Sequence, residues 1–158
     1  MWKWLAVGVA GAAAAAAGAF LWRPLRLARL ACQLERARRE FHRHREWLEV
    51  RFLELAGRSG MPRGLRWRHC EFEDEVAYAR ERRSGDLRAL VGMTVYFEAV
   101  EGGPMEGVEA VSRPRAATAV FCYRRRQWET DGRAIFNLSP VQAIAHFQHE
   151  LEAVPSQG

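Results

Sequence analysis

Cysteine and histidine are the residues of this chain whose pairing would support nucleophilic catalysis. His69 and Cys70 are neighbours in a predicted strand and therefore point to opposite faces, so neither can activate the other. A cysteine-histidine mechanism would need Cys70 or Cys122 to meet His146 or His149 in space. No nucleotide-binding loop, G-x-S-x-G or H-E-x-x-H motif is present. We therefore predict no catalytic residue, with a small enzyme built on a Cys/His pocket as an alternative.

Metal ligation has one candidate group. His146, His149 and Glu150 fall on neighbouring positions of one predicted helix, and two histidines three residues apart can share a metal. A further ligand with zinc-motif spacing is missing, so these residues are interpreted as a polar helix face.

An acidic run also occurs at a predicted turn: Glu71, Glu73, Asp74 and Glu75. It lacks the central glycine and alternating ligands of a calcium loop, so we expect neither a metal nor another cofactor.

A run of arginines is the candidate anion-binding patch of the C-terminal half. Arg124, Arg125 and Arg126 precede a predicted Asp131-Gly132 turn and have the chemistry to bind phosphate or an acidic partner. The alternative is the solvated end of a hairpin, which the arginine-rich composition favours.

The N-terminus predicts a membrane anchor. From Trp2 to Trp22 the only charged side chain is Lys3, and at about 1.5 Å per residue this helix would cover roughly 30 Å, the thickness of a bilayer core. Tryptophans at both ends suit the two interfaces. A cleaved signal peptide ending at Ala17-Gly18-Ala19, which would give an exported soluble protein, is the alternative.

The charge distribution predicts how the chain is oriented in the membrane and argues against nucleic-acid binding. Nine arginines follow the span between Arg23 and Arg51, and cationic flanks stay in the cytoplasm, so we expect a single-pass cell-membrane protein with its N-terminus outside and a cytoplasmic C-terminal domain. Residues 57–158 carry 14 basic and 14 acidic side chains, so the net charge of +5 belongs to the juxtamembrane helix. Nucleic acid is therefore not an expected partner. Three widely spaced cysteines without a C-x-x-C pair indicate free thiols in a reducing compartment.

The helix after the span has two predicted contact surfaces. Arg23, Arg26 and Arg29 lie beside the predicted membrane surface, where anionic lipid attracts each arginine by about 1 kcal/mol. A coiled-coil-like seam then predicts helix pairing and a homo-oligomer through Leu27, Leu30, Leu34, Phe41 and Leu48. The alternative is that the stripe packs on its own domain, which the extra apolar residues Trp47, Val50 and Phe52 favour for the C-terminal half.

Turn residues divide the rest of the chain. We expect an anchor at 1–22, a coiled-coil-like helix at 23–56, a linker at 57–64, an α+β domain at 65–154 and a tail at 155–158. A strand at 65–70 precedes a hairpin of 76–83 and 86–100 around Ser84-Gly85, which would set Arg83 opposite Asp86. The odd positions of the longer strand are all apolar, and Gly92 is typical of a bulge or bend.

The end of the domain predicts a second hairpin and a helix. Residues 107–112 are read as a short edge strand, and 118–129 and 133–138 as a hairpin around Asp131-Gly132. Ser139-Pro140-Val141-Gln142 is a capping box that starts a helix burying Ile144, Phe147, Leu151 and Val154. The fold class is therefore α+β, a mostly antiparallel sheet of five or six strands with a C-terminal helix.

These features describe an architecture more fully than an activity. We expect a non-enzymatic scaffold or protein-interaction module presented on a membrane stalk. The alternative is a domain that binds lipid or another anionic ligand at the membrane surface.

Overall fold

The computed structural model describes the backbone of residues 2–59 and 64–155, and the side chains of residues 28–58 and 64–155. The chain divides into two compact units, Met1–Arg39 and Glu40–Gly158. The first unit is part of one long helix, α1 (Trp2–Ser59), and residues 40–59 of that helix belong to the second unit. Among the residues searched for a membrane span, no helix combines sufficient length with sufficient apolarity. The side chains of the predicted span, Trp2–Trp22, lie outside the described ones.

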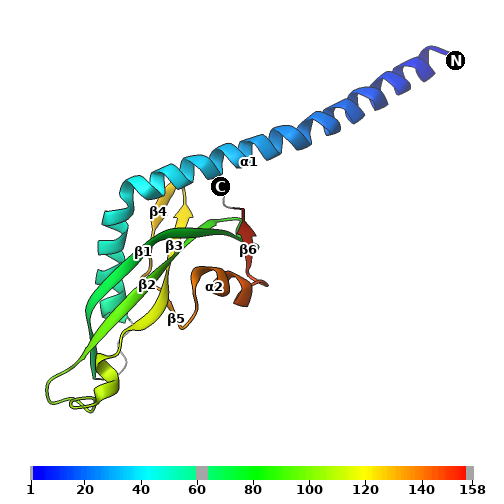
Figure 1. The fold of residues 1–158 in the computed structure, drawn as a ribbon. Helices are drawn as coiled ribbons and strands as arrows, with labels where there is room; N and C mark the ends of the chain where they lie inside the picture. The colour runs from blue at the N-terminus through cyan, green and yellow to red at the C-terminus, as the bar shows by residue number, and fades with distance from the viewer. Residues whose placement is uncertain (1, 60–63, 156–158) are drawn as a thin grey trace. The chain divides into compact units, whose positions relative to one another are not determined.

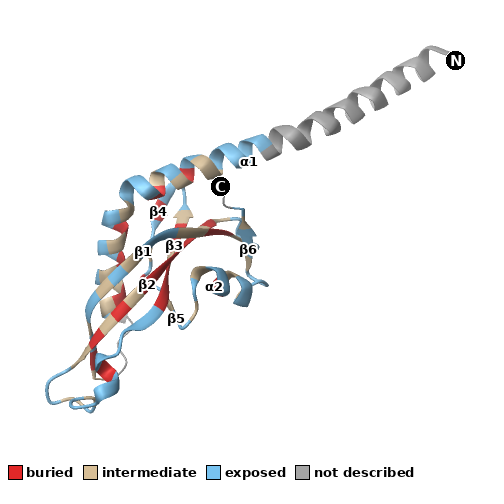
Figure 2. Ribbon diagram, in the orientation of Figure 1, coloured by how far each residue is buried: buried red, intermediate tan, exposed pale blue. Residues whose placement is uncertain are grey.

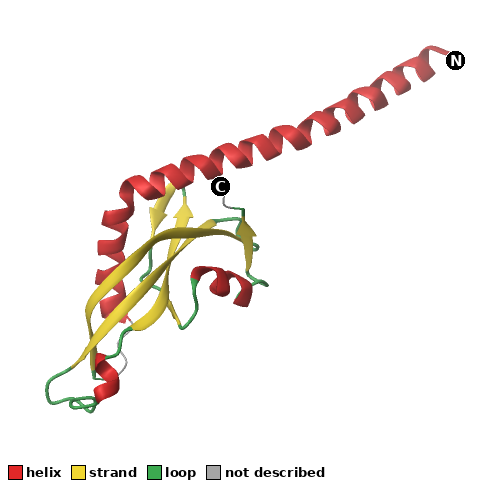
Figure 3. Ribbon diagram, in the orientation of Figure 1, coloured by secondary structure: helices red, strands yellow, loops and turns green. Residues whose placement is uncertain are grey.

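The second unit confirms the predicted α+β class with a six-stranded antiparallel sheet (Figures 1 and 3). Its elements are β1 (Leu65–Glu81), β2 (Leu87–Ala99), the 3-10 helix η1 (Glu109–Ser112), β3 (Arg115–Arg124), β4 (Gln127–Glu129), β5 (Ala134–Phe136), α2 (Pro140–His146) and β6 (Leu151–Val154). The strand order is β4-β3-β2-β1-β6, and β5 also pairs with β3.

Residues 40–59 of α1 cover one face of the sheet with aromatic side chains. Phe41 lies 5.3 Å from Phe121 and 4.9 Å from Trp128, measured between ring centroids, and Phe52 lies 5.8 Å from Phe121. The two Phe41 pairs are edge-to-face and the Phe52–Phe121 pair is tilted at 47°, and aromatic pairs at these distances add to the stabilisation from burial. Phe41 and Leu48 are fully buried here, so in the folded unit they are not available for the predicted pairing with a second helix.

The opposite face of the sheet carries a smaller core under α2. Ala79, Leu90 and Ala143 are fully buried there, and Ile144 and Leu151 pack against them. Because α1 covers one face and α2 covers part of the other, no residue of β2 is exposed and eight of its 13 residues are buried (Figure 2). The capping box of α2 is confirmed, since Ser139 Oγ accepts from the Gln142 amide and Gln142 Oε1 accepts from the Ser139 amide.

β1 is one long strand, and the predicted acidic turn between two strands is wrong. Phe72 pairs with Met93 and Val76 with Val91, so residues 73–75 form a bulge opposite Gly92. The Arg45 guanidinium of α1 donates to the bulge carbonyls of Glu73 and Asp74 and also binds Glu49. These bonds satisfy carbonyl groups that the bulge removes from the strand ladder.

The first hairpin is present, but its predicted register is wrong by two residues. Arg80 pairs with Leu87 and Tyr78 with Ala89. Residues 82–86 connect the two strands, and Gly85, at φ +78°, donates its amide to the Glu81 carbonyl. A shift of two keeps every side chain on its predicted face, so the apolar pattern could not detect the error.

The second hairpin forms at a different turn. Arg125 and Arg126, with φ of 49° and 65°, reverse the chain between β3 and β4. β5 pairs with β3, not with β4, so residues 130–133 bridge two short strands along one edge of β3. The predicted hairpin of 118–129 and 133–138 around Asp131-Gly132 is therefore wrong in its turn and register, because Ile135 pairs with Thr118 and Ala134 with Ala119.

Two further predicted elements differ. Residues 107–112 contain η1 where an edge strand was expected. α2 ends at His146, and Leu151 and Val154 lie in β6, which pairs with β1. Four residues are too few for apolar periodicity to separate a strand from the end of a helix. The pairing of residues 151–154 with the edge of β1 made this segment a strand.

Replacing Gly132 by alanine should destabilise the second unit. Gly132 has φ +77°, and a Cβ there would lie 2.5 Å from the Ala56 backbone nitrogen. We expect a loss of about 3 kcal/mol, from the left-handed conformation together with the displacement of α1. Denaturation of the full chain in mild detergent, followed by tryptophan fluorescence, measures it.

Gly85→Ala is the matched control. Gly85 has φ +78°, but its added Cβ would meet nothing within 4 Å. It should cost only about 1 kcal/mol. Equal losses in the two variants would contradict the close packing of residues 130–133 on α1.

Candidate anion-binding site

The side chains proposed for a Cys/His mechanism do not come together. Cys70 pairs across the sheet with Val95, whereas Cys122 pairs with Arg88. Val95 is seven positions from Arg88 along β2, which corresponds to about 23 Å along the strand. Cys70 Sγ contacts Met93 on the face covered by α1, and Cys122 points to the other face. The pocket lined by Cys122 contains no histidine.

The histidines are also not arranged as predicted. His146 is the last residue of α2, and His149 and Glu150 lie in the following turn, so the three do not share one helix face. Within the part of the chain that the structure describes, no three His, Cys, Asp or Glu side chains are grouped closely enough to hold a metal ion.

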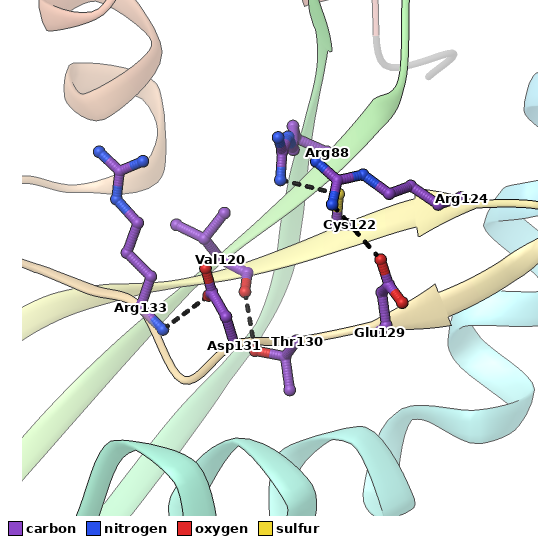
Figure 4. Close-up of a pocket in the computed structure, with 8 residues that line it drawn as sticks. All are labelled: Arg88, Val120, Cys122, Arg124, Glu129, Thr130, Asp131 and Arg133. Atoms are coloured by element: carbon purple, nitrogen blue, oxygen red, sulfur yellow. Dashed lines mark hydrogen bonds and ion pairs between the residues drawn. The ribbon is translucent and has the colours of Figure 1, made fainter. Parts of the chain in front are cut away.

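A pocket of about 350 Å³ lies over β3, on the face opposite residues 40–59 of α1 (Figure 4). Val120, Cys122 and Arg124 alternate along β3 and point into it, and Arg88 reaches it from β2. β4 and the connection to β5 supply the remaining wall, with Glu129, Thr130, Asp131 and Arg133. Three guanidinium groups therefore line one cavity.

Two of these arginines are held by acidic side chains. Arg88 NH2 lies 2.9 Å from Glu81 Oε2, and its NH1 donates to Cys122 Sγ at 2.7 Å. Arg124 Nε lies 2.9 Å from Asp86 Oδ2. Each guanidinium has five N–H donors, so both arginines keep donors for a ligand.

Arg133 differs from the other two arginines. Its guanidinium carbon lies 5.4 Å from the centroid of the Phe147 ring, and it forms no ion pair within the described residues. A cation over an aromatic face keeps its full charge and its hydrogen-bond donors. Arg133 is therefore the side chain of the pocket best placed to bind an added anion.

The connection from β4 to β5 is fixed by its own hydrogen bonds. Thr130 Oγ1 donates to the Val120 carbonyl and accepts from the Gly132 amide. Asp131 Oδ1 accepts from the Arg133 amide, and the Arg133 carbonyl accepts from the Val120 amide. These bonds tie the segment to β3 and set the position from which the Arg133 side chain starts.

Electrostatic coupling keeps the pocket assembled at neutral pH. The hydrogen bond from Ser84, with the ion pair to Arg88, lowers the pKa of Glu81. The hydrogen bond from Arg124 lowers the pKa of Asp86. Both carboxylates have folded-state pKa values below their unfolded values, so their stabilisation is present above the unfolded values and is lost as the pH falls through the folded ones.

Both thiols are unsuited to act as nucleophiles. Burial raises the pKa of Cys70 to about 12, and burial also raises the pKa of Cys122 despite the nearby arginines. A thiol in the protonated form is a poor nucleophile. Cys122 serves instead as an acceptor that orients Arg88.

Of the three arginines in the predicted patch, one lines the pocket. Arg124 lines it, whereas Arg125 and Arg126 form the exposed turn between β3 and β4. Arg88 and Arg133 were missed. Arg88 occupies an even position of β2, between the apolar odd positions, and an arginine there is only a weak signal of a site. The position of Arg133 depends on the pairing of β5 with β3.

The predicted lipid contacts lie mostly outside the described side chains. Those of Arg23 and Arg26 are not described, and Arg29 is exposed. Of the remaining predicted pairing residues, Leu27 is not described, Leu30 is exposed and Leu34 is half-buried.

Comparison with known proteins adds no relative: no family model, curated protein or solved structure matches this chain.

Alkylation rates should follow the environments of the three thiols. At pH 8, iodoacetamide should modify exposed Cys32 at least about ten times faster than Cys70 or Cys122 in the folded chain. With a pKa of about 12, Cys70 is a thiolate in about one molecule in ten thousand at that pH. Mass spectrometry of timed samples measures the rates, and denaturant should equalise them. Fast labelling of folded Cys122 would reopen the nucleophile hypothesis.

Proposed function

We propose that this chain is a membrane-tethered, non-enzymatic interaction module whose α+β domain binds a carboxylate group in the pocket over β3. The observation that carries the proposal is the guanidinium of Arg133, which forms no ion pair within the described residues and lines the same cavity as Arg88 and Arg124. Arginine binds carboxylates through two parallel hydrogen bonds, which gives geometric selectivity as well as affinity.

The charge of the lining favours a monoanion over a phosphate. Arg88 pairs with Glu81, and Arg124 pairs with Asp86 and Glu129, so Arg133 supplies the one positive charge of the lining that is not ion-paired within the described residues. A dianion would experience repulsion from the carboxylates after neutralising that charge. The adjoining hollow shares Arg88, Val120 and Arg133 with the pocket. Its other lining residues are the apolar Leu90, Ile135, Phe147 and Leu151 and two glutamates, Glu81 and Glu150. A carboxylate with a short apolar substituent therefore matches the site best.

Binding without chemical conversion is the function that these groups support. The pocket's only sulfur nucleophile, Cys122, is buried and has a raised pKa, and a bonded guanidinium occupies the position where a general base would be needed. The domain would accordingly present a bound ligand, or hold the terminal carboxylate of a partner, without altering it.

Butyrate titration of the full chain in mild detergent tests the proposal. Saturable ¹H–¹⁵N shifts are expected at Thr130 and at the side chain of Arg133, with a smaller response to inorganic phosphate. Arg133→Gln should weaken butyrate binding about ten-fold, because it removes a charged hydrogen-bond donor.

Arg126→Gln is the matched control, because Arg126 is an exposed arginine of the neighbouring turn that does not line the pocket. It should leave butyrate binding unchanged. Equal weakening by both substitutions would mean that butyrate senses only general charge, and the absence of a saturable shift would remove the proposed site. A peptide with a free C-terminal carboxylate, compared with its amidated form, distinguishes a partner's terminus from a free small acid.

The tether is the second part of the proposal. The uncharged stretch between Lys3 and Arg23 is long enough to cross a bilayer, and the arginines that follow it favour a cytoplasmic location for the domain. We propose a single-pass cell-membrane protein with its N-terminus outside. Arg23, Arg26 and Arg29 would then contact anionic headgroups.

Topology and processing can be measured together. A cysteine introduced at Gly158 should be protected from an impermeant maleimide in intact cells, and the mature chain should retain its N-terminal segment by mass. A chain shortened after Ala19 with an accessible C-terminus would support the exported alternative instead.

A further inference from the structure

One face of α1 carries two large apolar side chains that nothing else in the described chain covers. Trp47 is 61% exposed and Val50 is 57% exposed. The opposite face of the same helix buries Phe41, Leu48 and Phe52 completely. The helix therefore uses one side for its own core and presents a second apolar surface outward. Tryptophan is a residue that concentrates binding energy at protein interfaces.

The charged neighbours of these two residues are sorted by sign. We call the whole surface the outer face of α1, and its residues are Arg43, Glu46, Trp47, Val50, Arg51 and Glu54. Residues four apart form rows along a helix. Arg43, Trp47 and Arg51 make one row, and Glu46, Val50 and Glu54 make the adjacent row. The outer face is thus basic along one edge and acidic along the other.

This arrangement is self-complementary under one symmetry. A two-fold axis parallel to α1 places the basic row of one copy against the acidic row of its partner, and repeats the match on the other side. A perpendicular two-fold axis, which makes the helices antiparallel, brings the two basic rows together. Charge complementarity therefore selects a parallel pair, with Trp47 of each copy packed against Val50 of the other.

Two members of the outer face are free to enter such a contact. Arg43 and Glu46 form no ion pair within the described residues, and Arg51 and Glu54 form an exposed pair on the surface of the helix. In the parallel arrangement, Arg43 of one copy faces Glu46 of the other.

We infer that the outer face of α1 is a homodimer contact, and that its occupant is a second copy of this chain. This contact replaces the predicted seam at Phe41 and Leu48, which is occupied by the core. It does not depend on the pocket over β3, which lies on the other side of the sheet.

Sedimentation equilibrium of the full chain in mild detergent tests the dimer. Val50→Asp should raise the dimer dissociation constant at least about ten-fold, because it places a charge at the centre of the contact. Val141→Asp is the matched control, since Val141 is 70% exposed on α2 and should leave the dissociation constant unchanged.

Charge exchange tests the orientation. Arg43→Glu alone should weaken the dimer, because the new carboxylate faces Glu46 of the other copy. Adding Glu46→Arg to that variant should restore association, since the rows are again complementary.

Three results would overturn the inference. The first is a wild-type chain that sediments as a monomer at every concentration measured. The second is association that Val50→Asp does not weaken, which would assign the contact to another part of the chain. The third is stronger association of the single Arg43→Glu variant, which would indicate an antiparallel contact.

Discussion

The contact between the aromatic side chains of α1 and β3 is the interaction on which the second unit depends. Phe41 and Phe52 both lie against Phe121, and all three rings are completely buried. Removing the helix would expose one whole face of an antiparallel sheet to water, and burial of such rings is the largest available source of stability. Residues 40–59 of α1 are therefore part of the domain.

That packing also decides where polar groups can lie. Because α1 covers one face and α2 covers part of the other, charged side chains concentrate where β3 runs beyond the cover of α2. There Arg88, Arg124 and Arg133 line the pocket, and Glu81 and Asp86 hold two of them in place. Conversely, the face of α1 turned away from the sheet is free to display Trp47 and Val50.

The predicted features that the structure confirms are those that depend on local chemistry. The capping box at Ser139, the hairpin between β1 and β2, and the apolar face of β2 follow from turn residues and strand periodicity. The errors arose where pairing between distant segments decided the outcome. A hairpin shifted by two residues keeps the same face, and the partner of β5 was chosen by an open edge of β3 that no local pattern describes.

The sequence by itself determined the fold class, the start of α2 and the apolar alternation of β2, because each depends on neighbouring residues. It also determined that His69 and Cys70 cannot act as a catalytic pair, because adjacent residues of a strand point to opposite faces. Only the tertiary structure decided that Phe41 and Leu48 enter a core, that Leu151–Val154 is a strand, and that Arg133 joins Arg88 in one pocket. These outcomes depend on contacts between residues tens of positions apart. The free energy of such contacts depends on which apolar surfaces are still exposed once the sheet has formed. A short segment of sequence does not show which surfaces those are.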